Sequence, residues 1–156
     1  MSAFDPSAAA PPGSGIFGLP HSPDEAHVVL IPVPFEATTS YGGGTSDGPG
    51  AILEASRQVD LFDVEKGRPY ARGIALLPEP EAWREWNTRA KERAVPIVEA
   101  GGVAPGLEEA SREVNGLCEQ LHEAVYQTAR EWLAKGKRVG ALGGDHSISY
   151  GIIRAH

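Results

Sequence analysis

Short apolar runs that alternate with a long amphipathic helix constrain the fold of this chain more than any other feature. Residues 27–33 and 138–142 are nearly continuous in apolar side chains, as strands of a parallel sheet are when both faces are covered. Between them, residues 111–135 carry apolar side chains at three- and four-residue steps, which predicts one helix with a single apolar face. Gly136 follows, where a helix commonly ends. The alternation predicts an α/β fold of three layers, with helices on both faces of a central parallel sheet.

Shorter elements are predicted between these segments. Residues 73–77 form another apolar run, stopped by prolines, and predict a second strand. A short helix is expected with Asp47 as the N-cap residue, Gly48-Pro49 in its first turn and residues 51–55 continuing it, and another helix is expected at 81–94. The stretch 95–106 contains two prolines and three glycines, so we expect it to be irregular.

The first 24 residues differ in composition from the rest. They are rich in Pro, Ala, Ser and Gly and have no sustained hydrophobic period, so residues 1–24 are expected to form a flexible N-terminal arm. Ile16, Phe17 and Leu19 are the apolar residues that would pin part of it to a surface or to a neighbouring subunit. Residues 25–156 are then expected to form the α/β part.

Charge and composition exclude several classes of protein. With 21 acidic against 14 basic residues the net charge is −7, which argues against a nucleic-acid partner because such binding depends on basic residues. The single cysteine, Cys118, forms no internal disulfide, as expected in a reducing compartment. No apolar stretch approaches the roughly 18 residues of a membrane helix, and no secretory signal is evident. We expect a cytoplasmic protein with no membrane partner.

The sequence Gly143-Gly144-Asp145-His146, directly after the last predicted strand, is the strongest candidate for a functional site. Ligands of open α/β sheets bind beyond the carboxyl ends of the strands. A histidine there serves as a metal ligand, as a general base or as a structural loop residue. Metal-bound imidazoles are commonly oriented by a carboxylate, which Asp145 would supply. The alternative is that Asp145 holds the loop by accepting backbone N–H bonds.

Two sets of residues resemble the ureohydrolase family of arginases, agmatinases, formimidoylglutamases and guanidine hydrolases. Residues 143–147 resemble the first metal-binding motif of that family. The Pro-Val-Pro-Phe-Glu sequence at 32–36, followed by 38–42 and 48–52, looks like the first loop and helix of agmatinases. The two sets occur in the family's order, and the resemblance covers about residues 15–156.

The resemblance implies a metal-dependent enzyme. Members of the family have an α/β fold with a parallel sheet, two bridged manganese ions and usually a trimeric or hexameric assembly. His146 would be a ligand of one metal, supported by Asp145, and nickel is possible in guanidine-hydrolase relatives. Hydroxide held between the ions would attack a guanidinium carbon of an agmatine-like substrate and release urea.

The resemblance also implies that the loop after the first strand borders the substrate. Glu36, Tyr41 and Gly42 are therefore predicted substrate contacts. Glu36 stands where agmatinases commonly carry Asp, and a carboxylate at the mouth of a cleft would suit a cationic substrate. The alternative is that Glu36 is solvated and that the hydroxyl residues 38–40 only cap a turn.

This sequence departs from the family in one large respect. The other metal ligands of the family come from an Asp-Ala-His-x-Asp motif and a later Asp-x-Asp motif, and neither occurs here. No complete set of catalytic residues is assignable. We expect the chain to be the N-terminal half of an enzyme, completed by a C-terminal half in the same or a separate chain. The alternative is a noncatalytic α/β half that binds a partner chain through its sheet.

Overall fold

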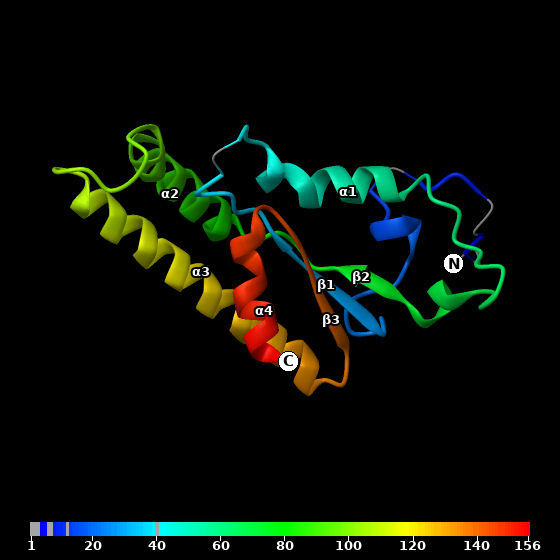
Figure 1. Cartoon of the computed structure of the whole chain (residues 1–156). Helices are drawn as coiled ribbons and strands as arrows, with labels where there is room; N and C mark the ends of the chain where they lie inside the picture. Colours follow the sequence, from blue (N-terminus) through cyan, green and yellow to red (C-terminus); the bar gives the residue numbers. More distant parts are fainter. Residues whose placement is uncertain (1–3, 6–7, 12, 40) are drawn as a thin grey trace.

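A parallel sheet of three strands forms the centre of the protein (Figure 1). The computed structural model describes residues 4–5, 8–11, 13–39 and 41–156. The strands lie in the order β2-β1-β3, with the bounds β1 (Val28–Val33), β2 (Ile74–Leu76) and β3 (Arg138–Gly143). Val28 lies beside the first residues of both neighbours, and Val33 lies beside Gly143. The carboxyl ends of β1 and β3 therefore meet at one edge, where the chain leaves Gly143 toward His146.

Helices cover both faces of this sheet. They are α1 (Gly48–Ser56), α2 (Glu81–Glu99), α3 (Glu108–Ala134) and α4 (Ser149–Ala155). Helix α3 contacts both α2 and α4, and the three helices share one apolar core with the sheet. Helix α1 packs with the short helix η1 (Ile16–Gly18) on the other face (Figure 1). The predicted three-layer α/β arrangement with a parallel sheet is confirmed.

The core lies between the sheet and α3. Ile31, Val33 and Phe35 alternate along β1 and its extension, so their side chains point to the same face, and each is at most 1% exposed. Leu121 and Val125 of α3, one helical turn apart, are 0% exposed in the same cluster. This packing fixes the carboxyl end of β1, against which the Gly143-Gly144 turn lies.

Part of the N-terminal segment packs on the domain. Ile16 and Leu19 are each 1% exposed, and the Phe17 amide donates to Ser56 Oγ at 2.9 Å. The prediction that apolar residues pin this segment is confirmed for Ile16 and Leu19. The flexible arm and its boundary at residue 24 stay predictions, and part of the arm lies outside the described residues.

The element boundaries differ from the predictions at three places. Helix α2 continues through Pro96 to Glu99. Proline removes one backbone donor from the helix, but the Pro96 carbonyl still accepts from Ala100 N at 3.1 Å, so the last turn is kept. Asp47 does not cap α1. The 3-10 helix η2 (Thr45–Asp47) runs directly into α1, so Asp47 has helical angles, and its carboxylate instead accepts from Arg84 at 2.9 Å.

Helix α3 begins three residues earlier than predicted, and its end is confirmed. Gly136 adopts φ +75°, and its amide donates to Leu133 O at 2.9 Å, as in the common glycine-terminated helix end. None of the helices in the described part of the chain combines the length and the apolar character needed to cross a bilayer.

Candidate functional site

Gly143, the last residue of β3, and Gly144 hold the chain against the end of β1. The Gly144 amide donates to Val33 O at 3.3 Å, and the Asp145 amide donates to Phe35 O at 2.9 Å. A Cβ atom on Gly144 would lie 1.7 Å from Phe35 O, and one on Gly143 would lie 1.9 Å from the Ile148 side chain. Only glycine allows this close approach, which places His146 beyond the carboxyl edge of the sheet.

The Asp145 carboxylate holds the turn that follows. Its Oδ1 atom accepts from the Ser147 amide at 2.9 Å and from Ser147 Oγ at 2.5 Å, so Asp145 is the N-cap of the 3-10 helix η4 (His146–Ile148). The interpretation that Asp145 holds the loop through a backbone N–H is confirmed. Its other oxygen, Oδ2, is buried and has no hydrogen-bond partner among the described residues.

The His146 imidazole is exposed at this edge. Within the described ranges no side chain hydrogen-bonds to its ring, and the Asp145 oxygen that is bonded has Ser147 as its partner. The imidazole is therefore open to a ligand. The predicted roles of His146 as a metal ligand and of Asp145 as its support stay predictions.

The described residues do not complete a metal centre. Across residues 4–5, 8–11, 13–39 and 41–156, no three His, Cys, Asp or Glu side chains lie close enough together to hold an ion. A single imidazole does not make up the three or more protein ligands of a typical catalytic metal site. The manganese ions implied by the resemblance do not fit these residues alone, and their other ligands would have to come from beyond the residues described.

Glu36 is buried at the base of the loop that follows β1. The residue is 2% exposed. Its Oε1 atom forms an ion pair with Lys91 of α2, and its Oε2 atom accepts from Gly44 N at 2.8 Å, Thr45 Oγ1 at 2.9 Å and Ser46 N at 3.1 Å. The interpretation of Glu36 as a solvated residue is wrong. A direct contact with substrate stays a prediction, although both oxygens already have protein partners.

These contacts also set the charge of Glu36. Burial raises the pKa of the carboxyl group, but the hydrogen bonds from Lys91, the loop amides and Thr45 outweigh it and lower the pKa to about 2. The carboxylate is therefore ionised at neutral pH and serves as a fixed acceptor.

The tip of the same loop is in solvent. Tyr41 is 99% exposed, and Gly42 adopts φ +66°, in the left-handed region. Beyond the tip the chain returns to the sheet, where a Cβ on Gly48 would lie 2.9 Å from Gly143 O. The structure therefore brings the returning end of the loop to the Gly143-Gly144 turn and leaves Tyr41 and Gly42 free. Ser40, one of the hydroxyl residues predicted to cap a turn, lies outside the described residues.

Sequence reasoning missed the two α2 residues that hold Glu36. Asn87 is 6% exposed, and its Oδ1 atom accepts from the Glu36 amide at 2.7 Å. Lys91 lies one turn further along the helix and forms the ion pair. The sequence does carry an indication of this role. Asn87 lies four residues after Trp83, on the apolar face of the predicted helix, and a buried side-chain amide there needs a hydrogen-bond partner.

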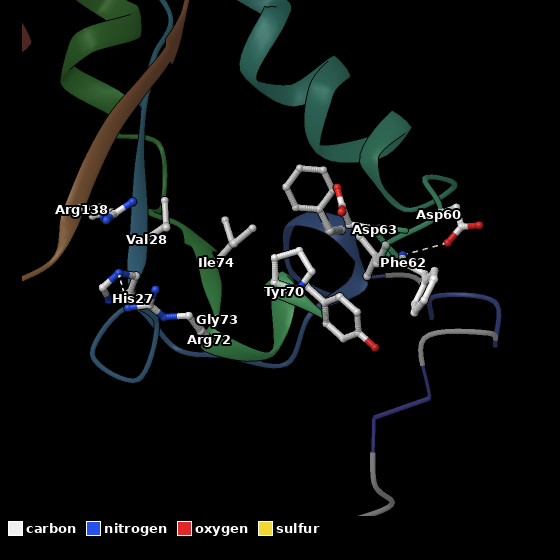
Figure 2. A pocket seen from close by; sticks show the side chains of 13 residues that line it. His27, Val28, Asp60, Phe62, Asp63, Tyr70, Arg72, Gly73, Ile74 and Arg138 are labelled. Atoms are coloured by element: carbon white, nitrogen blue, oxygen red, sulfur yellow. Dashed lines mark hydrogen bonds between the residues drawn. The ribbon is translucent and has the colours of Figure 1, made fainter. Parts of the chain in front are cut away.

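A separate cavity of about 440 Å³ lies at the opposite edge of the sheet (Figure 2). Val28, Ile74 and Arg138, the first residues of the three strands, help to line it. Figure 2 shows His27 beside Arg72, whose Nη2 atom lies 2.8 Å from His27 Nε2. Because this cavity is at the amino ends of the strands, it does not belong to the His146 site.

His27 is expected to titrate below the ordinary range of histidine. Burial of the ring lowers its pKa, and the positive charges of Arg72, Arg138 and Lys137 lower it further. The Arg72→Ala substitution should raise the pKa of His27, as measured by NMR titration of the ring protons. Arg112→Ala removes an equal charge from the surface of α3 and should leave the titration unchanged. A His27 pKa that does not respond to Arg72→Ala would contradict this electrostatic account.

The parallel sheet with a glycine turn and a histidine at its carboxyl edge defines an α/β protein with an edge-of-sheet site. A model of the arginase family matches residues 26–156. The chain belongs to the arginase family.

Named relatives agree with this assignment. An N(1)-aminopropylagmatine ureohydrolase of Thermus thermophilus is 33% identical over 143 residues, which are 90% of this chain and 38% of the relative. An N(1)-aminopropylagmatine ureohydrolase of Synechocystis is 31% identical over 132 residues, 84% of this chain and 35% of the relative. An agmatinase of Proteus mirabilis is 28% identical over 137 residues, 88% of this chain and 36% of the relative.

The predicted resemblance to agmatinase-like ureohydrolases is confirmed. The chain spans less than two-fifths of the length of these relatives. No solved structure was found to match it significantly.

Proposed function

We propose that this chain supplies one part of the active site of a metal-dependent hydrolase that releases urea from a guanidino substrate such as agmatine. One observation carries the proposal: in a chain of the arginase family, the Gly143-Gly144 turn holds an exposed His146 at the carboxyl edge of the parallel sheet. His146 would be a ligand of one of two manganese ions, with nickel as the alternative metal. The other ligands would come from a C-terminal half, in the same or a separate chain.

The loop after β1 would form one wall of the substrate cleft. Tyr41 and Gly42 are exposed at its tip and are the proposed contacts to the guanidino substrate. An enzyme of this kind would work in the cytoplasm as a trimer or hexamer.

A second candidate function is a noncatalytic α/β module that binds a partner chain. The position of β3 favours it, because this strand lies at the edge of the sheet and its residues from Val139 to Gly143 are only half-buried. The two candidates predict different behaviour. A module would form a stable complex with a second polypeptide without gaining metal-dependent activity.

The test joins this chain to the remainder of the Thermus thermophilus relative and measures urea release from agmatine and N(1)-aminopropylagmatine with added manganese. His146→Ala should reduce turnover at least about 100-fold and lower metal content. Mutation of a residue that only supports a metal ligand already costs roughly 10–100-fold, and loss of the ligand itself should cost at least as much. His156→Ala removes another exposed imidazole and should retain activity. A folded chimaera that neither binds a transition metal nor releases urea would contradict the proposal.

A further inference from the structure

Glu36 is tied to α2 at two points. Its amide donates to Asn87 Oδ1 at 2.7 Å, and its carboxylate pairs with the Lys91 ammonium. Asn87 and Lys91 are four residues apart and therefore lie on the same face of α2. The helix thus holds both the backbone and the side chain of one residue, and the orientation of Glu36 is fixed.

The other side of the carboxylate holds the loop. Gly44 N, Thr45 Oγ1 and Ser46 N all donate to Oε2, at 2.8, 2.9 and 3.1 Å. Oε2 therefore has three donors, and Oε1 is paired with Lys91. Because Glu36 is also only 2% exposed, its carboxylate is engaged by the protein and is poorly accessible to a substrate cation.

Gly43 closes over the ion pair. A Cβ atom at this position would lie 2.7 Å from Lys91 Nζ and 3.3 Å from Glu36 Oε1. The absence of a side chain lets the loop backbone pass directly over the pair. A side chain at position 43 would require the Lys91 ammonium to move.

The segment that Glu36 fixes leads to the candidate site. Residues 44–46 run through η2 into α1, and η2 contacts β3. Gly48 then packs against Gly143 O, three residues before His146. A continuous set of contacts therefore runs from α2 through Glu36 to the turn that presents the imidazole.

We propose that Glu36 is a positioning residue, held by Asn87 and Lys91, that fixes the loop of residues 41–47 against the Gly143-Gly144 turn. The consequence for a substrate cleft rests on the proposed function, whereas the fixing of the loop is a property of this chain. Glu36 thus acts through the shape of the loop, and the exposed tip at Tyr41 and Gly42 is left to meet the substrate.

Hydrogen exchange of the chain, read by mass spectrometry at neutral pH, tests the proposal. In Glu36→Gln and Lys91→Met, exchange in the segment containing Gly44 and Ser46 should accelerate by about tenfold, the loss expected when a charge-assisted hydrogen bond is weakened. Exchange in β1 should change less. Lys91→Arg, which retains the charge, should restore part of the protection. Glu92→Gln removes an exposed carboxylate from the same helix and should have no effect.

Two outcomes would overturn the proposal: loop exchange equal to wild type in folded Glu36→Gln, or acceleration of the same size throughout the chain. Should Glu36→Gln not fold, Lys91→Met is decisive. It removes the ammonium that pairs with Oε1 and leaves Glu36 in place, and unchanged exchange in the same segment would also overturn the proposal. The exchange measurement needs no metal or substrate, so failure of the urea assay would contradict the proposed function and not the role of Glu36. Unchanged loop exchange would overturn the role of Glu36 even if urea is released.

Discussion

The Gly144→Ala substitution is expected to lower the free energy of unfolding by about 4 kcal/mol, at the high end of single-residue effects. The added Cβ would lie 1.7 Å from Phe35 O and 2.6 Å from the Phe35 carbonyl carbon. Both atoms are backbone, so no side-chain rotation relieves the overlap. The turn would have to move away from β1, and it would then lose the hydrogen bonds to Val33 O and Phe35 O. Chemical denaturation followed by circular dichroism measures the loss.

Two other glycines provide matched controls. Gly116 in α3 has no atom within 4 Å of an added Cβ, so Gly116→Ala should stabilise the chain by about 0.5–1 kcal/mol through helix propensity. Gly140 in β3 meets only the tip of the Leu30 side chain, at 3.1 Å, so Gly140→Ala should cost much less than Gly144→Ala. Equal losses for Gly140→Ala and Gly144→Ala would show that contact with the β1 backbone is not the cause.

The fold was predictable where local sequence and tertiary structure require the same residues. Strand β1 is largely buried and strand β3 is half-buried. Both read as apolar runs, and α3 has one apolar face against the sheet. The end of α3 depends on local sequence alone, and Gly136 is sufficient to indicate it. Predictions failed where a neighbouring segment changes the local outcome, as at Asp47, where η2 already supplies the helical turn before α1.

The position of His146 was predictable, but the partners of Glu36 were not. A glycine pair after a buried strand indicates the edge of a parallel sheet, and this requires only residues close in the chain. Glu36 and Lys91 are 55 positions apart, and no periodicity relates a loop carboxylate to one particular lysine of a helix. Their contact depends on how α2 packs, and the same packing reverses the expectation of a solvated carboxylate.

Acid is expected to remove the stabilisation that Glu36 contributes. The folded pKa of Glu36 is lowered from 4.5 to about 2, so its contribution is complete above pH 4.5 and is lost as the pH falls toward 2. The shift corresponds to about 3 kcal/mol, and we expect about 2 kcal/mol because Lys91 is 37% exposed and solvent screens the pair. Urea denaturation of wild type and Glu36→Gln from pH 7 to pH 2 measures this contribution as the difference between the two.

That difference isolates Glu36 from the other carboxylates, because their titration is common to both proteins. Wild type should be more stable than Glu36→Gln by a constant amount between pH 5 and 7, and the two should converge as Glu36 is protonated. Glu54→Gln breaks an ion pair with Arg57 whose carboxylate is 70% exposed, and it should change stability by less than about 0.5 kcal/mol at every pH. A wild-type advantage over Glu36→Gln that persists unchanged at pH 2 would mean that packing of the side chain, and not its charge, holds the loop.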